Sequence, residues 1–428
     1  MNGLEMRRMK LTLSKMLTIF VAVLTVTWSC GAAEERPWRA LISRTDPELH
    51  RCAEFKEQKP MPWLAVRGTR IVDSQDREIR LGGIALPISD DPAWSDYPMH
   101  GTKLLQYYAG LGCNAIRISF NINTAQPFEQ YVDEMIEPLV KAAKEFRCYL
   151  ILDMHEYKYG SLEGGAKGPK PDFEATLLER WRYLAGRYRN ESAIAAYELW
   201  NEPDLLDGGR QDINDHRLYL TKLIRAVRRI DPRHILIVNG VLGGFGPTTA
   251  LTWGENYHYD GAKAMKSEKN WLTPTGIKPV YDSSVPEIRF ERPEQWEHPD
   301  PEKNMIFAFH CGHFLVNVQN ASLEYHIANH RNILACFAKT FCVPVMCTEW
   351  ECEPPDTAGR EFMQMVADWF REDRDVAGWL IWRVHLTREY MEKYYKEFRS
   401  GGYVRPGELD PAYADIWLPL TAVECRRP

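Results

Sequence analysis

Two glutamates in this sequence follow apolar runs and have neighbours that suit chemistry on sugars. Glu202 belongs to an Asn-Glu-Pro motif and Glu349 to a Thr-Glu-Trp motif. Two carboxylic groups facing one cleft can cleave a glycosidic bond, because a protonated one donates to the leaving oxygen while an ionised one attacks the anomeric carbon. One of these two glutamates is therefore expected to be the general acid/base and the other the nucleophile.

Two further side chains are expected to assist this pair. Arg117 lies in another apolar run and, as a nearby cation, would keep the carboxylate of the nucleophile ionised. Asn201 precedes Glu202 and is expected to hydrogen-bond the sugar 2-hydroxyl, a contact that strengthens in the transition state. These residues serve one site only if the fold brings the ends of several apolar runs together.

Eight short apolar runs alternate with amphipathic segments from residue 63 onward, which is typical of βα units around a parallel sheet. The runs cover residues 82–86, 114–120, 149–155, 194–200, 234–238, 305–309, 343–348 and 378–382. Continuous apolar sequence indicates strands that are buried on both faces. We predict an α/β fold, a (β/α)8 TIM barrel, whose active site lies at the carboxyl ends of the strands.

The segments between these runs have helical periodicity. The apolar residues with this spacing are Phe128, Tyr131, Val132, Met135, Ile136, Leu139 and Val140 in one segment and Leu218, Leu220, Leu223, Ile224 and Val227 in another, and residues 357–370 behave similarly. The pattern favours amphipathic helices that pack against the barrel with one face.

Two additions to the barrel are expected. An N-terminal β-hairpin is predicted from residues 66–70 and 78–81, which flank a polar turn at residues 73–75. A long insertion, about residues 240–303, separates strands five and six and is too long for an ordinary loop, which indicates functional elaboration. Since nothing splits off a second domain, residues 34–428 are predicted to form a single catalytic domain.

The first residues have the pattern of an export signal. Basic residues precede an apolar stretch at 16–28, so we predict a signal peptide over residues 1–33. The stretch is shorter than the roughly 20 residues of a membrane span, and no transmembrane segment is expected. Cys30 leaves open a lipid anchor. The protein is therefore expected to be secreted or periplasmic, or else a membrane-anchored lipoprotein.

The chain has 10 cysteines, and an exported protein meets oxidising conditions in which disulfides persist. Cys113 and Cys148 open two successive predicted strands and are the pair that we expect to form a disulfide. The alternative is that both are small buried thiols. No cysteine or histidine spacing indicates zinc, and no metal is expected.

The charge pattern narrows the class of partner. The formal net charge is −6, from 53 basic and 59 acidic residues without long runs of either sign. Nucleic-acid binding is therefore not expected. The expected partner is a polysaccharide or oligosaccharide substrate, and the protein is expected to be a monomer.

With its Asn-Glu-Pro motif and its second strand-end glutamate, the sequence resembles the glycoside hydrolases of clan A, family 5, over about residues 63–384. The resemblance implies retaining hydrolysis of β-linked sugars, with Glu202 as the general acid/base and Glu349 as the nucleophile. No cofactor is expected. By motif position it implies the substrate-binding residues Arg117, His155, Asn201, His310 and Trp382, with Trp382 as the floor on which the sugar stacks. For the two histidines a buried structural role remains the alternative, and Asp153 is expected to be structural.

One position departs from that family. Its members usually carry a tyrosine two residues after the histidine that matches His310, and here Gly312 stands there. His313, Tyr257 or Tyr259 are candidates to replace it. The expected function is an endo-β-1,4-glucanase or β-mannanase that works by double displacement. The alternatives are a carbohydrate-binding protein that has lost turnover, suggested by the missing tyrosine, and a transglycosylase.

Overall fold

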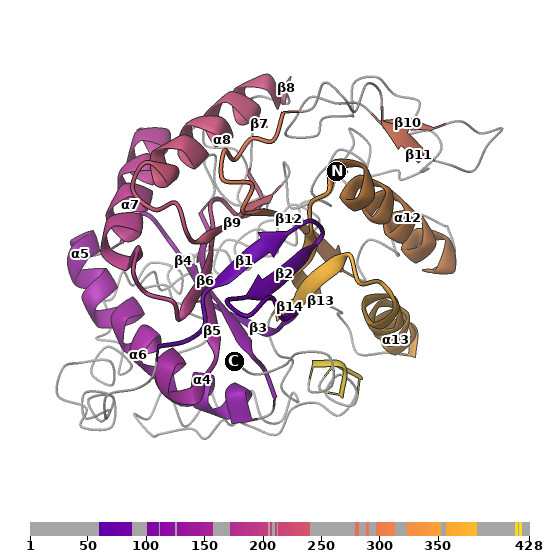
Figure 1. Cartoon of the computed structure of the whole chain (residues 1–428), viewed down its shortest axis with the longest axis horizontal. Helices are drawn as coiled ribbons and strands as arrows, with labels where there is room; N and C mark the ends of the chain where they lie inside the picture. The colour runs from indigo at the N-terminus through magenta and orange to yellow at the C-terminus, as the bar shows by residue number, and fades with distance from the viewer. Residues whose placement is uncertain are drawn as a thin grey trace, which may run out of the picture.

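The chain forms a closed barrel of eight parallel strands surrounded by helices (Figure 1). The computed structural model describes residues 60–87, 101–110, 112–124, 126–156, 172–203, 206–207, 210–211, 213–239, 279–281, 288–290, 297–312, 323–351, 357–382, 416–417 and 419–421. The barrel strands are β3 (Leu81–Pro87), β4 (Ala115–Phe120), β5 (Tyr149–Met154), β6 (Ile194–Glu198), β9 (Ile235–Asn239), β12 (Met305–Gly312), β13 (Val345–Glu351) and β14 (Val376–Trp382). Each of the eight predicted runs contributes one strand, so the predicted TIM barrel is confirmed.

Strand order around the barrel follows the chain, and β14 pairs with β3 to close it. The strands are continuously apolar because both faces are covered: every residue of β4 and β5 is buried. Gly83 and Gly378 lie where neighbouring strands approach closely. A Cβ atom would lie 1.9 Å from the Ala115 carbonyl oxygen at Gly83 and 2.2 Å from that of Leu81 at Gly378, so these two positions require glycine.

Helices cover the outside of the barrel (Figure 1). They are α4 (Gly101–Gly110), α5 (Phe128–Tyr131), the π-helical η2 (Val132–Ile136), α6 (Glu137–Phe146), α7 (Phe173–Tyr188), α8 (Ile213–Arg228), α12 (Leu323–Phe341) and α13 (Thr357–Glu372). The predicted helical segments are confirmed in α5 to α6, α8 and α13. Leu218 is an exception, since it is 61% exposed; it lies two residues from Leu220, roughly 200° away around the helix.

An N-terminal hairpin is present as predicted, but its two arms are not residues 66–70 and 78–81, and its main turn lies earlier. β1 (Leu64–Arg67) pairs antiparallel with β2 (Arg70–Asp73), and the chain reverses at Gly68, whose φ of +61° suits glycine. The predicted turn after Asp73 is a second reversal, in which the side chain of Asp73 accepts hydrogen bonds from the backbone of Gln75 and Arg77. The side chain of Asn304 accepts from the backbone of Val66 and ties the hairpin to the start of β12.

The predicted insertion between strands five and six is present, because 65 residues separate β9 from β12 in the sequence. Its described part includes the antiparallel pair β10 (Pro279–Tyr281) and β11 (Ile288–Phe290). A second short pair, β7 (Leu206–Asp207) and β8 (Arg210–Gln211), follows β6. Both pairs are small additions to a single barrel.

The predicted disulfide between Cys113 and Cys148 is wrong. Both are buried and neither forms a disulfide, and no disulfide joins any other pair of the described cysteines. The register pairs Ala115 with Tyr149, which places Cys148 beside Asn114 rather than Cys113. Neighbouring side chains along a strand point to opposite faces, so a one-residue offset separates the two sulfurs.

Several predictions concern residues that the structure does not describe. The signal peptide, Cys30, His313, Tyr257 and Tyr259 all lie outside the described residues. Within the described part of the chain, no helix is both long and apolar enough to cross a membrane.

A buried ion pair supports the barrel at the start of β12. Arg228 donates through Nε and Nη2 to the two carboxylate oxygens of Asp300, at 2.7 and 2.8 Å. Asp300 also accepts from the backbone amides of Glu302 and Asn304. Burial alone would raise the pKa of Asp300, but the guanidinium and these donors outweigh it and hold the pKa below its usual value.

We expect Asp300→Asn to lower the unfolding free energy by about 3–5 kcal/mol at pH 7, because it leaves the Arg228 charge buried without its partner. A depressed folded-state pKa contributes stability above the unfolded value, roughly 3.9, that is lost as the pH falls. The difference between the two proteins should therefore shrink below about pH 4. Denaturant unfolding at a series of pH values measures it, and a constant difference would contradict this account of the pair.

Candidate active site

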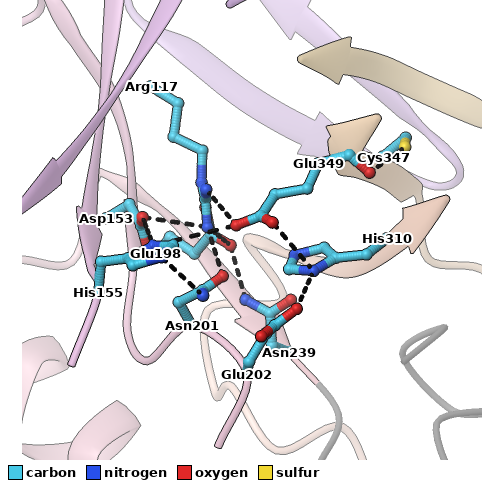
Figure 2. A network of polar contacts seen from close by, with 10 residues as sticks. All are labelled: Arg117, Asp153, His155, Glu198, Asn201, Glu202, Asn239, His310, Cys347 and Glu349. Atoms are coloured by element: carbon cyan, nitrogen blue, oxygen red, sulfur yellow. Dashed lines mark hydrogen bonds and ion pairs between the residues drawn. The ribbon is translucent and has the colours of Figure 1, made fainter. Parts of the chain in front are cut away.

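The predicted site residues come together at the carboxyl ends of the barrel strands. Arg117 lies on β4, His155 follows β5, Asn201 and Glu202 follow β6, His310 lies on β12, Glu349 on β13 and Trp382 at the end of β14. Figure 2 shows six of these seven side chains converging from different strands. The structure thus places all seven in one cluster, as the sequence predicts.

Arg117 is the centre of the cluster and is fully buried. Its Nη1 donates to Oε1 of Glu349 at 2.8 Å, and its Nη2 donates to Oδ1 of Asn201 at 2.6 Å. Nε and Nη2 donate to the two carboxylate oxygens of Glu198 at 2.7 and 3.0 Å, and Nη2 lies 3.0 Å from Oδ2 of Asp153. One guanidinium therefore serves three carboxylates.

The surrounding charges determine the ionisation of this cluster. Burial alone would lower the pKa of Arg117, but Asp153, Glu198 and Glu349 outweigh it and raise the pKa. Burial alone would raise the pKa of Asp153, but Arg117 and His155 hold it below its usual value. Both groups are consequently charged across the ordinary pH range.

Glu349 is nearly buried and faces three nitrogens. Besides the 2.8 Å contact with Arg117, its Oε1 lies 3.9 Å from Nδ1 of His155, and its Oε2 lies 3.6 Å from Nδ1 of His310. Near Glu349, the register of β13 shifts against both of its neighbouring strands, β12 and β14. Such irregularities re-aim side chains beside active sites, and here the Glu349 carboxylate lies between Arg117 and His310 (Figure 2).

Glu202 occupies an unusual backbone conformation. Its φ is +39°, in a region that costs a residue other than glycine about 1–3 kcal/mol and is often found at functional sites. Its side chain remains 20% exposed, and its Oε1 lies 2.8 Å from Nδ1 of His310. Pro203 follows and disfavours a helical continuation, so the chain turns sharply and holds the carboxyl group over the barrel.

The two carboxyl groups are close together. One oxygen of Glu202, one oxygen of Glu349 and a ring nitrogen of His310 all lie within 4.8 Å of one another. Retaining glycosidases have carboxyl groups about 5–5.5 Å apart, whereas inverting ones need about 6.5–9.5 Å to admit a water molecule. The spacing therefore matches the retaining arrangement.

The same three groups have the spacing of a possible cation site. Carboxylates and imidazole do bind divalent transition metals. Here, however, His310 and Glu202 are already joined by a 2.8 Å contact, which a cation would have to break. The direct contact itself accounts for the closeness of these groups.

His310 connects the two carboxylates. Burial alone would lower the pKa of its imidazole, but Glu349 and then Glu202 outweigh burial and raise it. The protonated ring is therefore favoured and donates from Nδ1 toward Glu202. Nε2 is buried and has no hydrogen-bond partner among the described residues, so one polar atom of the site remains available.

Trp382 lies at the edge of the cluster, 8% exposed. Its ring stacks on His155 with centroids 4.8 Å apart and planes 9° apart, and the Arg117 guanidinium lies 5.9 Å from the ring centroid. One indole face is therefore covered by His155. A sugar would have to use the other face or the rim.

Two members of the cluster, Glu198 and Asn239, are not predicted from the sequence. Asp153, which is expected to be structural, contacts both Arg117 and His155. Asn239, which ends β9, donates to Oε1 of Glu198 at 2.6 Å. A charged residue inside a buried apolar strand was the signal, because such a charge needs a buried partner.

The departure at Gly312 remains in the structure, since this glycine ends β12. Its candidate replacements lie outside the described residues. The described side chains that bring a nitrogen close to the Glu349 carboxylate are those of Arg117, His155 and His310. These nitrogens supply the positive charge and donors that the described part of the site offers to Glu349.

Comparison with known proteins places this geometry in a family. The family described as Cellulase (glycosyl hydrolase family 5) matches residues 72–385. An endoglucanase from Clostridium saccharobutylicum is 28% identical over 179 residues, 41% of this chain and 36% of that protein. A β-xylosidase from Phanerodontia chrysosporium is 24% identical over 234 residues, 42% of this chain and 46% of that protein. The matches thus span less than half the length of either relative.

Solved structures share the fold. The β-glucanase SdGluc5_26A from Saccharophagus degradans, in complex with cellotetraose, superposes with a TM-score of 0.57 at 17% identity and covers 85% of this chain and 94% of that chain. At this identity the likeness concerns the barrel fold alone.

Proposed function

Because the chain belongs to glycosyl hydrolase family 5, we propose that it hydrolyses β-linked glycans with retention of configuration, with Glu349 as nucleophile and Glu202 as general acid/base. The observation that carries the proposal is the geometry of this pair. Their carboxyl oxygens lie within 4.8 Å, Glu349 is ion-paired with Arg117 and Glu202 contacts His310. The two carboxyl groups thus have different environments, as two different roles require.

In the first step the ionised Glu349 attacks the anomeric carbon while Glu202 gives its proton to the departing glycosidic oxygen. The ion pair with Arg117 supports the ionised form of Glu349. The greater exposure of Glu202 suits a group that must reach the leaving group. The products of this step are a glycosyl-enzyme ester on Glu349 and a released sugar.

In the second step Glu202, now ionised, takes a proton from water, and the water oxygen attacks the anomeric carbon. The bond to Glu349 breaks and its carboxylate again faces Arg117. His310 contacts Glu202 and lies near Glu349, so its raised pKa keeps a positive charge beside whichever carboxylate is ionised. Two inversions at one carbon give overall retention.

Five residues are proposed to bind the sugar: Arg117, His155, Asn201, His310 and Trp382. Asn201 is buried, with its oxygen held by Arg117 and its amide nitrogen 3.4 Å from Nε2 of His155. This fixed amide is proposed to bind the 2-hydroxyl. The free ring nitrogen of His310 suits a second sugar hydroxyl.

The proposed substrate is a β-1,4-linked glucan or mannan cut internally. The endoglucanase name of one relative supports the glucan, while the β-xylosidase name of another shows that related barrels differ in substrate. We further propose export by a signal peptide over residues 1–33, with lipidation at Cys30 as the alternative, and a single catalytic domain over residues 34–428 that acts as a monomer.

An activity screen on β-linked polysaccharides, with the first products followed by NMR, tests the proposal. We expect hydrolysis of a β-1,4-glucan or mannan, and the newly formed reducing end should appear first as the β anomer. An initial α anomer would contradict the double displacement. Binding without hydrolysis would favour a carbohydrate-binding protein, the alternative suggested by the glycine that replaces the family's tyrosine at position 312. New glycosidic bonds at high acceptor concentration would indicate a transglycosylase.

A further inference from the structure

We propose that Glu198 is a positioning residue for this reaction: it fixes the Arg117 guanidinium against the nucleophile and sets how much of its charge the nucleophile receives. The inference rests on the proposed function, because it assigns Glu349 as the nucleophile. Glu198 is the last residue of β6, lies beside the Arg117 guanidinium in Figure 2 and is fully buried. It would not touch the sugar; it acts through Arg117.

The contacts of the guanidinium define its orientation. Nε and Nη2 of Arg117 both donate to Glu198, one to each carboxylate oxygen, at 2.7 and 3.0 Å. Such bidentate pairs fix the plane of the guanidinium as well as its position. Glu198 thereby occupies the edge of the guanidinium formed by Nε and Nη2, and Nη1 donates to Glu349 at 2.8 Å. A rotation of the guanidinium that broke the first pair would also misalign the second.

Glu198 is itself held from the next strand of the barrel. Nδ2 of Asn239 donates to its Oε1 at 2.6 Å, and Asn239 is the last residue of β9. The opposite atom of this amide, Oδ1, is buried and has no partner among the described residues. The amide is therefore oriented by Glu198, and the chain of contacts from β9 through β6 to β4 supports the nucleophile on β13.

Charge gives Glu198 a second effect. Arg117 neutralises part of three carboxylates, those of Asp153, Glu198 and Glu349. Because Glu198 pairs with the same guanidinium, the positive charge of Arg117 stabilises the Glu349 carboxylate less. Glu349 therefore remains a better nucleophile. The other titratable groups near Glu349 are His155, His310, Glu202 and Cys347, and the Cys347 thiol donates to the backbone carbonyl of Glu349. None of them contacts the Nε edge that Glu198 occupies.

Glu198→Gln tests the proposal because it keeps the shape of the side chain and removes its charge. We expect kcat to fall about 10- to 100-fold, since small misplacements of catalytic groups cost on this order, while KM changes by less than about 3-fold. With one negative charge removed, protonation of the cluster becomes harder, so the acidic limb of the kcat/KM profile should move toward lower pH by about half a unit or more.

Two further variants complete the test. Asp300→Asn is the matched control, because it removes the carboxylate of another buried bidentate pair, with Arg228; it should lower stability and leave the acidic limb in place. Glu198→Asp keeps the charge but shortens the reach, so kcat should fall at least about 5-fold with an unmoved limb. If Glu198→Gln does not fold, Glu198→Asp replaces it: a kcat lowered at least about 5-fold with an unchanged KM supports the positioning role, and an unchanged kcat overturns it.

Several outcomes would overturn the inference. Wild-type kinetics in Glu198→Gln, or in Glu198→Asp, would show that the bidentate pair does not position the nucleophile. A lower kcat with an unmoved acidic limb in Glu198→Gln would show a purely structural role. These failures differ from failure of the proposed function, in which the wild-type protein itself hydrolyses none of the polysaccharides.

Discussion

Glu349→Ala is expected to lower kcat on the natural polysaccharide by at least about 10⁴-fold, which corresponds to about 5.4 kcal/mol of transition-state stabilisation. The double displacement needs an ionised group at the face of the sugar opposite the leaving oxygen. In the structure that group is the carboxylate held 2.8 Å from Nη1 of Arg117. The alanine removes the attacking atom while Arg117 and His310 remain, so binding should be retained.

Rescue by azide makes this loss diagnostic. With an activated aryl β-glycoside, azide should enter the space left by the Glu349 carboxylate and attack from that face, which gives an α-glycosyl azide. Activity should rise with azide concentration. An unrescued variant with normal sugar affinity would weaken the assignment, and a β-glycosyl azide would place the nucleophile elsewhere.

Glu202→Ala should have an effect that depends on the leaving group. A natural sugar leaves as a poor alkoxide and needs the proton, so kcat/KM on polysaccharide should fall about 10²- to 10⁴-fold. A dinitrophenyl glycoside leaves without protonation, and its kcat/KM should change less than about 10-fold. Steady-state kinetics on both substrates measure the difference.

The azide product again provides the control. In Glu202→Ala the glycosyl-enzyme still forms on Glu349, so azide attacks the opposite face and should give a β-glycosyl azide. The two variants should thus give opposite anomers from the same reagents. Equal losses on both substrates would count against the acid role of Glu202.

The positions of the catalytic candidates could be predicted because the barrel imposes a simple rule. Each barrel strand is a buried apolar run, and polar residues at its carboxyl end face the common mouth. The apolar runs that carry or precede Arg117, Glu202 and Glu349 are easily recognised in the sequence. In the structure these three residues belong to one network of contacts. The rule needs only the order of apolar and polar residues along the chain.

Features that depend on registers and rotamers could not be predicted in this way. Glu198 is the last residue of β6 but falls inside the longer apolar run predicted as a strand, residues 194–200, and only its contact with Arg117 gives it a role. The supposed pairing of Cys113 and Cys148 failed through a one-residue register offset. Leu218 is predicted from its spacing to be among the buried apolar residues of its helix, but its side chain is exposed.

The backbone at Glu202 was also beyond sequence reasoning. Its φ of +39° is disfavoured locally and persists because the surrounding structure holds it. The backbone amide of Asn201 donates to the carbonyl of Met154, and its side chain is held by Arg117. These contacts come from two neighbouring strands, so the conformation follows from the assembled barrel rather than from the local sequence.

The central claim is that Glu349 forms a covalent bond to the sugar, and trapping that bond tests it most directly. A 2-deoxy-2-fluoro β-glycoside with a good leaving group, made from the sugar that the substrate screen selects, slows the second step so that the intermediate accumulates. Mass spectrometry of the intact protein and of its peptides should find one added fluorosugar, on the peptide that contains Glu349. An adduct on another residue, or turnover of polysaccharide with inverted products and no adduct, would contradict the account.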